Sequence, residues 1–266
     1  MRCYSDLVRY RELFVNLFRR DFHAKYRDSA LGVLWSLVNP IALMGVYLVV
    51  FGVIWSKNGG IPRYPLYLLA GITCWLFFGV SLQAASRSLV DSAELIKKVR
   101  FPRQLVAFSV VATQAVTFVV MLGLLVVLSL AFVPAARDTV WIGVALAPLF
   151  ACLVLGVSLV VACLNVMYRD IEHVLAAALF PWFFLTPVLW SFDRLPASAM
   201  RHHVLLDGLR WGNFVTPPLN ALRDPIWLGR VPRLADVVYL VAAAGIALVL
   251  GAFVFGRVDD RIAVQL

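Results

Sequence analysis

The stretch that decides the fold is Gln104–Ala136, QLVAFSVVATQAVTFVVMLGLLVVLSLAFVPAA, whose 33 residues include no Lys, Arg, Asp or Glu. A helix needs about 20 apolar residues to cross the hydrocarbon core of a bilayer. Water is absent there, so backbone polar groups must bond within the segment, and a helix is the simplest crossing. This run alone predicts an integral membrane protein.

Five further runs share this lack of charge, and none is shorter than 20 residues: Ser29–Ser56, Tyr64–Ser86, Thr139–Tyr168, His173–Phe192 and Val237–Gly256. The chain is 62% hydrophobic and 15% charged, with a mean hydropathy of +0.87, whereas soluble domains average about 45–50% apolar and 25% charged. We predict an all-α integral membrane protein with six transmembrane helices. Residues 1–266 form one domain, with a cytoplasmic interfacial segment (1–28), a six-span bundle (29–256) and a cytoplasmic tail (257–266).

The Lys and Arg residues divide unevenly between the two sides of the predicted bundle. With the N-terminus taken as cytoplasmic, fifteen fall on its side, including seven before residue 28 and five in Arg87–Gln104, and nine fall on the other. Cytoplasmic loops carry the excess of these cations. We therefore expect both termini and Tyr168–Glu172 in the cytoplasm and Asp193–Asp236 outside. The excess of cations behind the net charge of +9 is explained by this topology, so we predict no nucleic-acid partner.

Two cytoplasmic segments have amphipathic patterns. Asp6–Tyr26 places apolar residues at helical spacing, which predicts a helix in the membrane interface with its cations toward anionic headgroups; a plain anchor helix is the alternative. Ala93–Phe101 predicts a short helix stopped by Pro102. That segment is either a solvated loop or a docking surface for a cytoplasmic partner. Outside, Trp211–Leu222 is too short to span and predicts re-entrant or interfacial half-helices within Asp193–Asp236.

Motifs for catalysis are absent from the sequence. It contains no Gly-x-x-x-x-Gly-Lys-Ser/Thr loop, so we expect no ATP hydrolysis by this chain. It contains no His-Glu-x-x-His or Cys-x-x-Cys, and we predict neither a metal site nor a cofactor. The six runs hold no carboxylate or cation of the kind that proton-coupled carriers place at mid-membrane depth. Any energy for transport must then come from a partner.

Aromatic rings are frequent in the runs Ser29–Ser56 and His173–Phe192. Rings near span ends are most often an interfacial belt, but ring faces also stack on the C–H faces of sugars. A ring-lined path would suit a sliding saccharide chain, and it would also need polar groups. Gln114 requires a hydrogen-bond partner, either on a neighbouring helix or in a wet cavity. The candidates for the path are Tyr47, Phe51, Gln83, Thr113, Gln114, Thr117, Trp182 and Phe184.

A family resemblance rests on four segments. Arg20–Pro40, RDFHAKYRDSALGVLWSLVNP, resembles the opening of ABC-2-type permeases, and more narrowly of the exporters of O-antigen, capsule and teichoic acid. Leu95–Pro102 resembles the family's cytoplasmic loop with its Phe-Pro step, and Tyr168–Ile171 resembles the Arg-Asp-Ile after the fourth span. Asn213–Asp224 resembles the stretch before the last span, although Phe214 stands where the family usually has Pro.

The resemblance implies a permease subunit in the bacterial cytoplasmic (inner) membrane. It would form a homodimer, pair with two ABC ATPase subunits that bind ATP and Mg, and export a lipid-linked or membrane-anchored glycan. A permease for a small lipophilic compound or lipid is the alternative, and an intramembrane glycolipid enzyme is a third class. In the family the first cytoplasmic loop contacts the ATPase, which here assigns Glu94, Leu95, Lys97, Lys98, Arg100 and Phe101. The interfacial helix lies near the cytoplasmic entrance, which assigns Arg20, Asp21, Lys25, Tyr26 and Trp35.

Overall fold

The computed structural model describes residues 6, 9–27, 32–50, 61–99, 101–195 and 201–265, and every regular element in these ranges is helical. The principal helices, in chain order, are α2 (Arg11–Tyr26), α3 (Trp35–Tyr47), α4 (Tyr64–Asp91), α5 (Ala93–Lys98), α6 (Gln104–Phe132), α7 (Val140–Met167), α8 (Ile171–Leu185), α10 (His203–Asp207), α11 (Thr216–Trp227) and α12 (Leu234–Gln265). Single turns occur at η1 (Gly32–Leu34), η3 (Pro134–Arg137) and η4 (Phe192–Arg194), and η5 (Gly208–Gly212) is π-helical. The predicted all-α class is confirmed.

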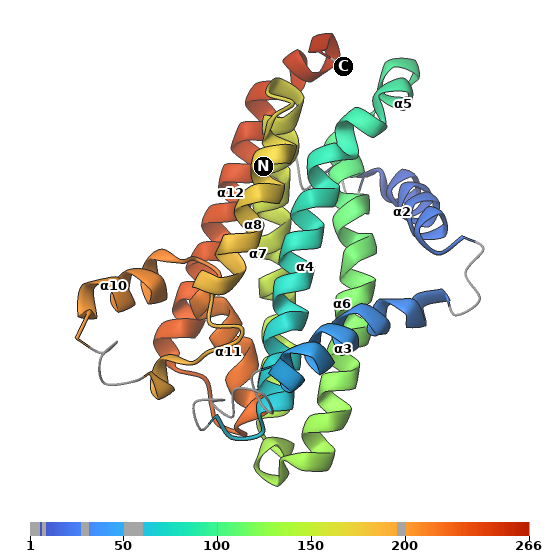
Figure 1. Ribbon diagram of the computed structural model, residues 1–266. Coiled ribbons are helices and arrows are strands. Elements are labelled where there is room, and N and C mark those ends of the chain that lie inside the picture. The colour runs from blue at the N-terminus through green and yellow to red at the C-terminus, as the bar shows by residue number, and fades with distance from the viewer. Residues whose placement is uncertain are drawn as a thin grey trace.

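Four helices, α4, α6, α7 and α12, are long and apolar enough to cross a bilayer. They run side by side along the length of the molecule (Figure 1). The shortest of the four candidate spans has 25 residues, and at 1.5 Å per residue it is about 37 Å long, which exceeds the roughly 30 Å hydrocarbon core. Their facing sides, together with α11, form the main hydrophobic core, which includes Tyr67, Phe78, Phe150, Leu222 and Leu240.

The pair α7 and α12 packs closely because a glycine lies at the crossing. A Cβ on Gly156 would lie 2.3 Å from the backbone carbon of Ala247, closer than any side chain can fit. Gly251 of α12 lies at the same crossing, where an added Cβ would be 2.8 Å from the carbonyl oxygen of Gly156. The small residues therefore let the two backbones touch directly, as is common between membrane helices.

Two of the predicted spans correspond to shorter helices. α3 has 13 residues and α8 has 15, and each falls short of the 18 residues that define the long candidates. The run His173–Phe192 does not remain helical to its end. The helix stops at Leu185 because Pro187 follows Thr186, and a residue before proline disfavours the helical conformation. Thr186 accordingly adopts φ −88° and ψ 138°.

Other predicted boundaries also differ from the observed ends of the helices. α6 ends at Phe132 rather than Ala136, since Val133 is non-helical and Pro134 begins a separate turn. α4 extends past Ser86 to Asp91. α12 continues to Gln265, so residues 257–265 of the predicted tail belong to the last helix. The helices predicted within Asp6–Tyr26 and Ala93–Phe101 are present as Arg11–Tyr26 and Ala93–Lys98. Their placement relative to a membrane remains a prediction.

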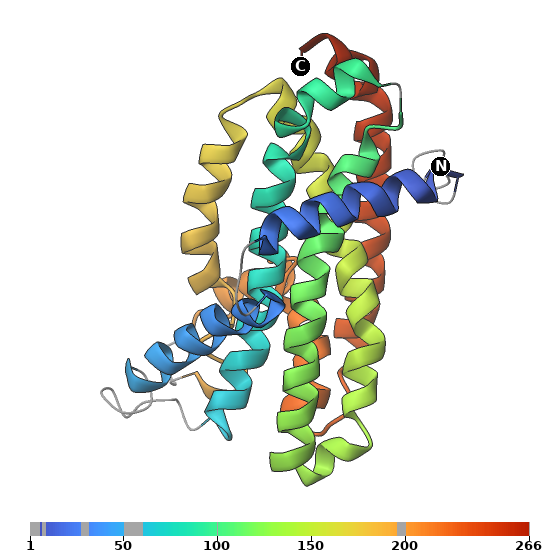
Figure 2. The same cartoon turned by 90° about the vertical axis from the view of Figure 1, so that its right-hand side faces the viewer.

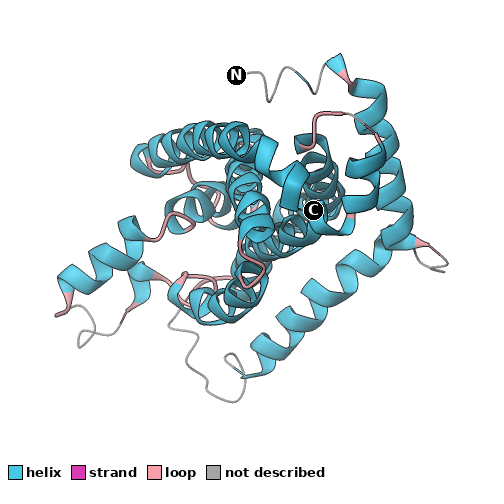
Figure 3. Cartoon of the chain, turned by 90° about the horizontal axis from the view of Figure 1, so that it is seen from above, coloured by secondary structure: helices cyan, strands magenta, loops and turns pink. Residues whose placement is uncertain are grey.

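The N-terminal helices cover one side of the bundle. α2 lies across the upper half of α6 in Figure 2, and α3 slants away below it. Seen along the bundle, both helices lie outside the group of long helices, while α10 projects on another side (Figure 3). α5 and the C-terminal end of α12 lie at the same end of the molecule (Figure 1). At this end Leu17, Leu89, Ile96, Leu105 and Phe255 belong to a second hydrophobic cluster.

Candidate functional site

A cavity of about 700 Å³ lies where α2 and the first half of α3 cover α4 and α6. One part of its lining carries charged, amide and hydroxyl groups, and the other carries rings and aliphatic side chains. The polar lining comprises Arg20, Asp21, Lys25, Asn39, Thr73, Arg87, Ser88, Asp91, Ser92, Thr113, Gln114 and Thr117. The apolar lining includes Trp35, Leu76, Phe77, Val80, Val110, Phe118 and Met121. Such a lining can contact an amphiphile along its whole length.

The end of α2 is bound to the middle of α6. Lys25 Nζ donates to Gln114 Oε1 at 2.6 Å and to Thr117 Oγ1 at 2.9 Å. The Tyr26 hydroxyl lies 3.0 Å from the same Thr117 oxygen. Gln114 is ten residues into α6 and therefore about 15 Å along its axis. The partner that an amide in a charge-free span requires is thus a lysine from the N-terminal helix.

A second group of polar contacts lies nearer the start of α6. Asp21 accepts from Ser109 Oγ at 2.6 Å and from Arg20 Nε at 2.9 Å. Arg20 also reaches Ser92 Oγ, at 3.5 Å, where α4 meets α5. The five residues assigned to the entrance all line the cavity, together with Thr113, Gln114 and Thr117 from the predicted path. The structure therefore brings eight of the sequence-derived candidates into one place.

The remaining path candidates lie elsewhere. The Tyr47 ring stacks on Phe183 with centroids 5.9 Å apart. Trp182 packs edge-on against Trp75, Phe78 and Phe214, and Phe184 is exposed. Gln83 is exposed on α4 and is not part of the cavity lining, and Phe51 lies outside the described residues. Within one chain the predicted path thus separates into two places. Its polar candidates Thr113, Gln114 and Thr117 lie in the cavity beside α2, and its described ring candidates lie around α8.

The residues assigned to ATPase contact occupy α5 and the turn after it. Glu94 and Lys98 are exposed, and they pair across one helical turn with their charged atoms 3.5 Å apart. Leu95 and Phe101 are partly buried against the second cluster, and Lys97 is exposed. Arg100 lies outside the described residues. α5 therefore presents charge to solvent while Ile96 fixes it to the bundle.

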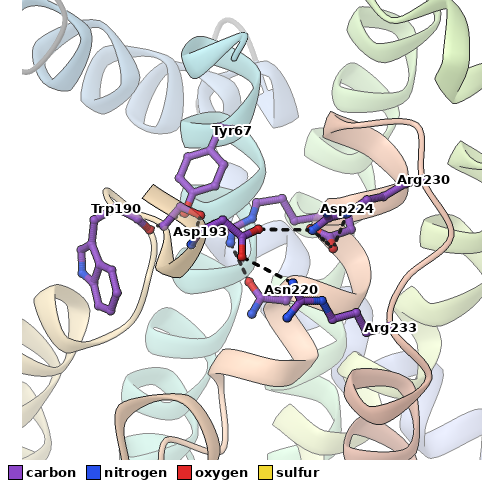
Figure 4. Close-up of polar contacts among 9 residues, drawn as sticks. Tyr67, Trp190, Asp193, Asn220, Asp224, Arg230 and Arg233 are labelled. Carbon is purple, nitrogen blue, oxygen red and sulfur yellow. Dashed lines mark hydrogen bonds and ion pairs between the residues drawn. The ribbon is translucent and has the colours of Figure 1, made fainter. Parts of the chain in front are cut away.

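The sequence reasoning missed a charged cluster between α4, α11 and the start of α12 (Figure 4). Arg223 and Asp224 are buried in it, and the partners Asp193, Arg230 and Arg233 are exposed at its edge. Arg223 is 3% exposed, lies 3.9 Å from the centre of the Tyr67 ring, and donates to Pro187 O and Asn220 Oδ1, both at 2.6 Å. Asp224 accepts from Arg230 Nε at 3.0 Å and Nη2 at 2.7 Å. The part of the predicted half-helix that belongs to α11 is therefore packed inside the protein, and its depth relative to a membrane stays a prediction.

The sequence signal for this cluster is the Arg223–Asp224 pair, which ends the segment Asn213–Asp224 that carries the family resemblance. Charges in a loop ordinarily suggest solvent, and only the surrounding helices show that these are enclosed. Arg230 and Arg233 both approach Asp193, at 3.7 Å and 3.4 Å, and Tyr67 donates to the carbonyls of Pro187 and Trp190. The cluster therefore joins the start of α4, the chain after α8 and the start of α12.

Two asparagines with defined roles were also missed. Asn165 in α7 contacts both α4 and the first turn of α8. Asn213 accepts from Trp182 Nε1 at 3.0 Å and donates to Thr186 Oγ1 at 2.9 Å, and so holds the other end of α8. Asn213 opens one of the segments that carry the resemblance, whereas Asn165 lies in an apolar run where only its polarity distinguished it.

These features define the class of multi-pass helical membrane proteins, with a lateral cavity between helices as the main site. Comparison with known proteins narrows the class. The ABC-2 type transporter family matches residues 12–226, and the chain belongs to this family. It is a permease domain, and its family pairs such domains with separate ATPase subunits.

Three relatives carry the same name. The O-antigen export system permease protein RfbA of Myxococcus xanthus is 31% identical over 254 residues, which cover 94% of this chain and 92% of the relative. Two proteins of that name from Klebsiella pneumoniae are each 28% identical, over 70% of this chain and 71% of their own length. The similarity to the Myxococcus xanthus protein therefore extends through the cavity, α8 and the charged cluster.

Proposed function

We propose that this chain is the permease subunit of an ATP-driven exporter of O-antigen or a related cell-envelope glycan attached to a lipid. The subunit forms a homodimer in the bacterial cytoplasmic membrane and binds two ATPase subunits. It crosses the membrane six times, with α3 and α8 as the two short crossings and both termini in the cytoplasm. Its similarity to O-antigen export permeases over 94% of the chain carries this proposal.

The cavity beside α2 supports the same function. A lipid-linked glycan has an apolar chain and a polar head, and the lining offers rings and aliphatic groups next to cations, amides and hydroxyls. Lys25 donates to two neutral oxygens, so its positive charge remains available to an anionic group of a substrate. A purely apolar substrate would make no use of the charge of these side chains, which favours the glycan over a small lipophilic compound.

The other assignments follow from this function. α5 is the surface that docks the ATPase, through Glu94, Lys97, Lys98 and the adjoining residues. The ring-bearing face of α8, with Phe184, forms part of the route between the two protomers. Single exposed ion pairs contribute only about 0.2–1 kcal/mol, so the docking test combines Lys97→Glu with Lys98→Glu. Loss of ATPase copurification without loss of membrane insertion is the expected result.

The cavity is tested by export in cells that lack the native gene. Lys25→Met and Gln114→Leu each remove one side of the contact between α2 and α6 and change the polarity of the lining, while His23→Gln changes an exposed residue on the same helix. We expect both cavity variants to reduce surface glycan and to leave lipid-linked glycan in the cytoplasmic leaflet, with His23→Gln normal. Normal surface glycan in cells without the chain would contradict the proposed function.

A further inference from the structure

α8 touches the rest of its chain at few points. Leu179 is the only buried residue among its 15, and it faces Gly79 of α4, where an added Cβ would lie 3.8 Å from the leucine Cδ1. Phe180 is 72% exposed. An element with few buried contacts can shift relative to its surroundings at low cost. The contacts at its two ends therefore decide where α8 lies.

Asn165 fixes the first turn of α8 to α4. Its Nδ2 donates to the carbonyl of Ser86 at 2.9 Å, and its Oδ1 accepts from the backbone N–H of Glu172 at 3.0 Å. The first N–H groups of a helix have no partner within the helix, so Asn165 supplies one. The residue is 3% exposed. Both bonds form together only while α4 and α8 keep their present distance.

A charged contact joins the same two helices. The Arg87 guanidinium pairs with the Glu172 carboxylate. Arg87 directly follows Ser86 on α4, and Glu172 is the residue whose backbone N–H binds Asn165. Arg87 also lines the cavity beside α2. One turn of α4 therefore holds the start of α8 through two adjacent residues and forms part of the cavity wall.

α4 is continuous with the proposed docking helix. The N–H of Ser92 donates to Ser88 O at 3.2 Å and the N–H of Ile96 donates to Ser92 O at 3.0 Å, so backbone bonds continue through the bend. Ile96 is buried in the same cluster as Leu89. Six residues, or about 9 Å of helix, separate Ser92 from Ser86. A displacement of α5 is therefore transmitted to Ser86 and Arg87.

The far end of α8 has a different attachment. Asn213 binds both Trp182 and Thr186, and it directly precedes α11, of whose 12 residues 11 are buried. The C-terminal end of α8 is thus tied to α11 through Asn213, and it also packs on α4, since the Trp182 ring contacts Trp75 and Phe78. The first turn of α8 is held by α4 and α7. A movement of the end of α4 that adjoins α5 would therefore shift the first turn of α8 relative to its C-terminal end.

We propose that Asn165 and the Arg87–Glu172 pair are positioning residues that transmit movement of α5 to α8. This inference rests on the proposed function, in which ATPase closure displaces α5 and the ring-bearing face of α8 lines the glycan route. The connection converts a displacement at the cytoplasmic end into a two-state shift of one helix. Asn165 and Glu172 lie outside the cavity lining, and each acts through the helix that it holds.

Charge reversal tests the ion pair in the complex of this chain with its ATPase. Arg87→Glu and Glu172→Arg should each lower glycan export per ATP hydrolysed roughly tenfold, within the range of measured coupling effects. Basal ATP hydrolysis should stay within about twofold in Glu172→Arg, because Glu172 lies outside the cavity lining and the fold is retained at this partly exposed position. The double variant should recover export. Arg137→Glu in η3, exposed and distant from α8, makes the same charge change as a control.

Asn165→Ala should show the same loss of export per ATP without the possibility of rescue by charge. Two results would overturn the proposal: single reversals that export as well as Arg137→Glu, or a double variant no better than the singles.

A second measurement separates failure of this proposal from failure of the proposed function. Spin labels at Phe180 and at Val249 on α12 should report an ATP-dependent change in distance that Arg87→Glu abolishes. That change is measurable even if the wild-type complex exports no glycan, and its presence unaltered in Arg87→Glu would refute the connection.

Discussion

α8 and α11 are both short, proline-containing helices, yet they are held in opposite ways. α11 has 11 of its 12 residues buried and carries Arg223 and Asp224 into the core. α8 has one buried residue among 15 and is fastened by side-chain amides at both ends and by the rings of Trp182 and Phe183 at its C-terminal end. Length and proline content therefore do not distinguish a fixed helix from a movable one. The number and kind of buried contacts do.

The largest expected effect lies in the fixed region. Arg223→Ala removes hydrogen bonds to Pro187 O and Asn220 and the stacking on Tyr67. Charge-assisted bonds contribute about 1.5–3 kcal/mol each, so we expect a loss of at least about 3 kcal/mol and a sharply lower Tm in detergent. Arg223→Lys should recover only part of it, because lysine lacks the planar fork. Arg201→Ala, at an exposed position of the same loop, is the control, and an Arg223→Ala Tm equal to that control would contradict the rigid role of α11.

A matched pair of glycines compares the packing of the two helices. A Cβ on Gly143 of α7 would lie 3.0 Å from the Leu222 carbonyl oxygen of α11, whereas a Cβ on Gly79 of α4 would lie 3.8 Å from Leu179 of α8. We expect Gly143→Ala to destabilise by about 1–3 kcal/mol through overpacking. Gly79→Ala should be neutral or stabilising, since alanine is favoured over glycine in helices by about 1 kcal/mol. Equal Tm changes in the two variants would show that both interfaces are equally tight.

A smaller loss of stability than that of Arg223→Ala or Gly143→Ala is expected at the C-terminal attachment of α8. Trp182→Phe keeps a ring against Trp75 and Phe78 but removes the bond to Asn213 Oδ1. A hydrogen bond contributes about 0.5–1.5 kcal/mol net, so the Tm should fall slightly while glycan export falls more. Asn213→Ala should act in the same direction, and the two changes combined should be less than additive. Additive effects would indicate that the residues do not act through their shared bond.

Much of this architecture is predictable from the sequence, and the exceptions have physical causes. Counting charge-free residues finds α6 and α7 because apolar length is what a bilayer selects. The same count continues His173–Phe192 through Thr186, because it does not register that Pro187 disfavours the helical conformation of Thr186. Residue-level conformational rules were needed for that boundary.

The candidate site was predictable in a similar way and to a similar extent. Gln114 needed a partner, and the pattern of the N-terminal helix placed a lysine near the membrane, but the pairing of Lys25 with Gln114 is a matter of tertiary geometry. Arg223 and Asp224 appeared to belong to a loop because charges usually indicate solvent. Their burial depends on Tyr67 and Arg230, which lie on other segments and have no local signature.

Amide hydrogen exchange in the ATPase complex, held in lipid nanodiscs with and without ATP, tests the contrast between the two helices most directly. The account predicts that amides in the first turns of α8, from Val174 to Leu179, change their exchange rate at least about tenfold on ATP binding, which corresponds to 1.4 kcal/mol of local stability. Amides of α11 from Leu219 to Trp227 should stay protected in both states. Protection of α8 equal to that of α11 and unchanged by ATP would contradict the claim that α8 is the movable helix.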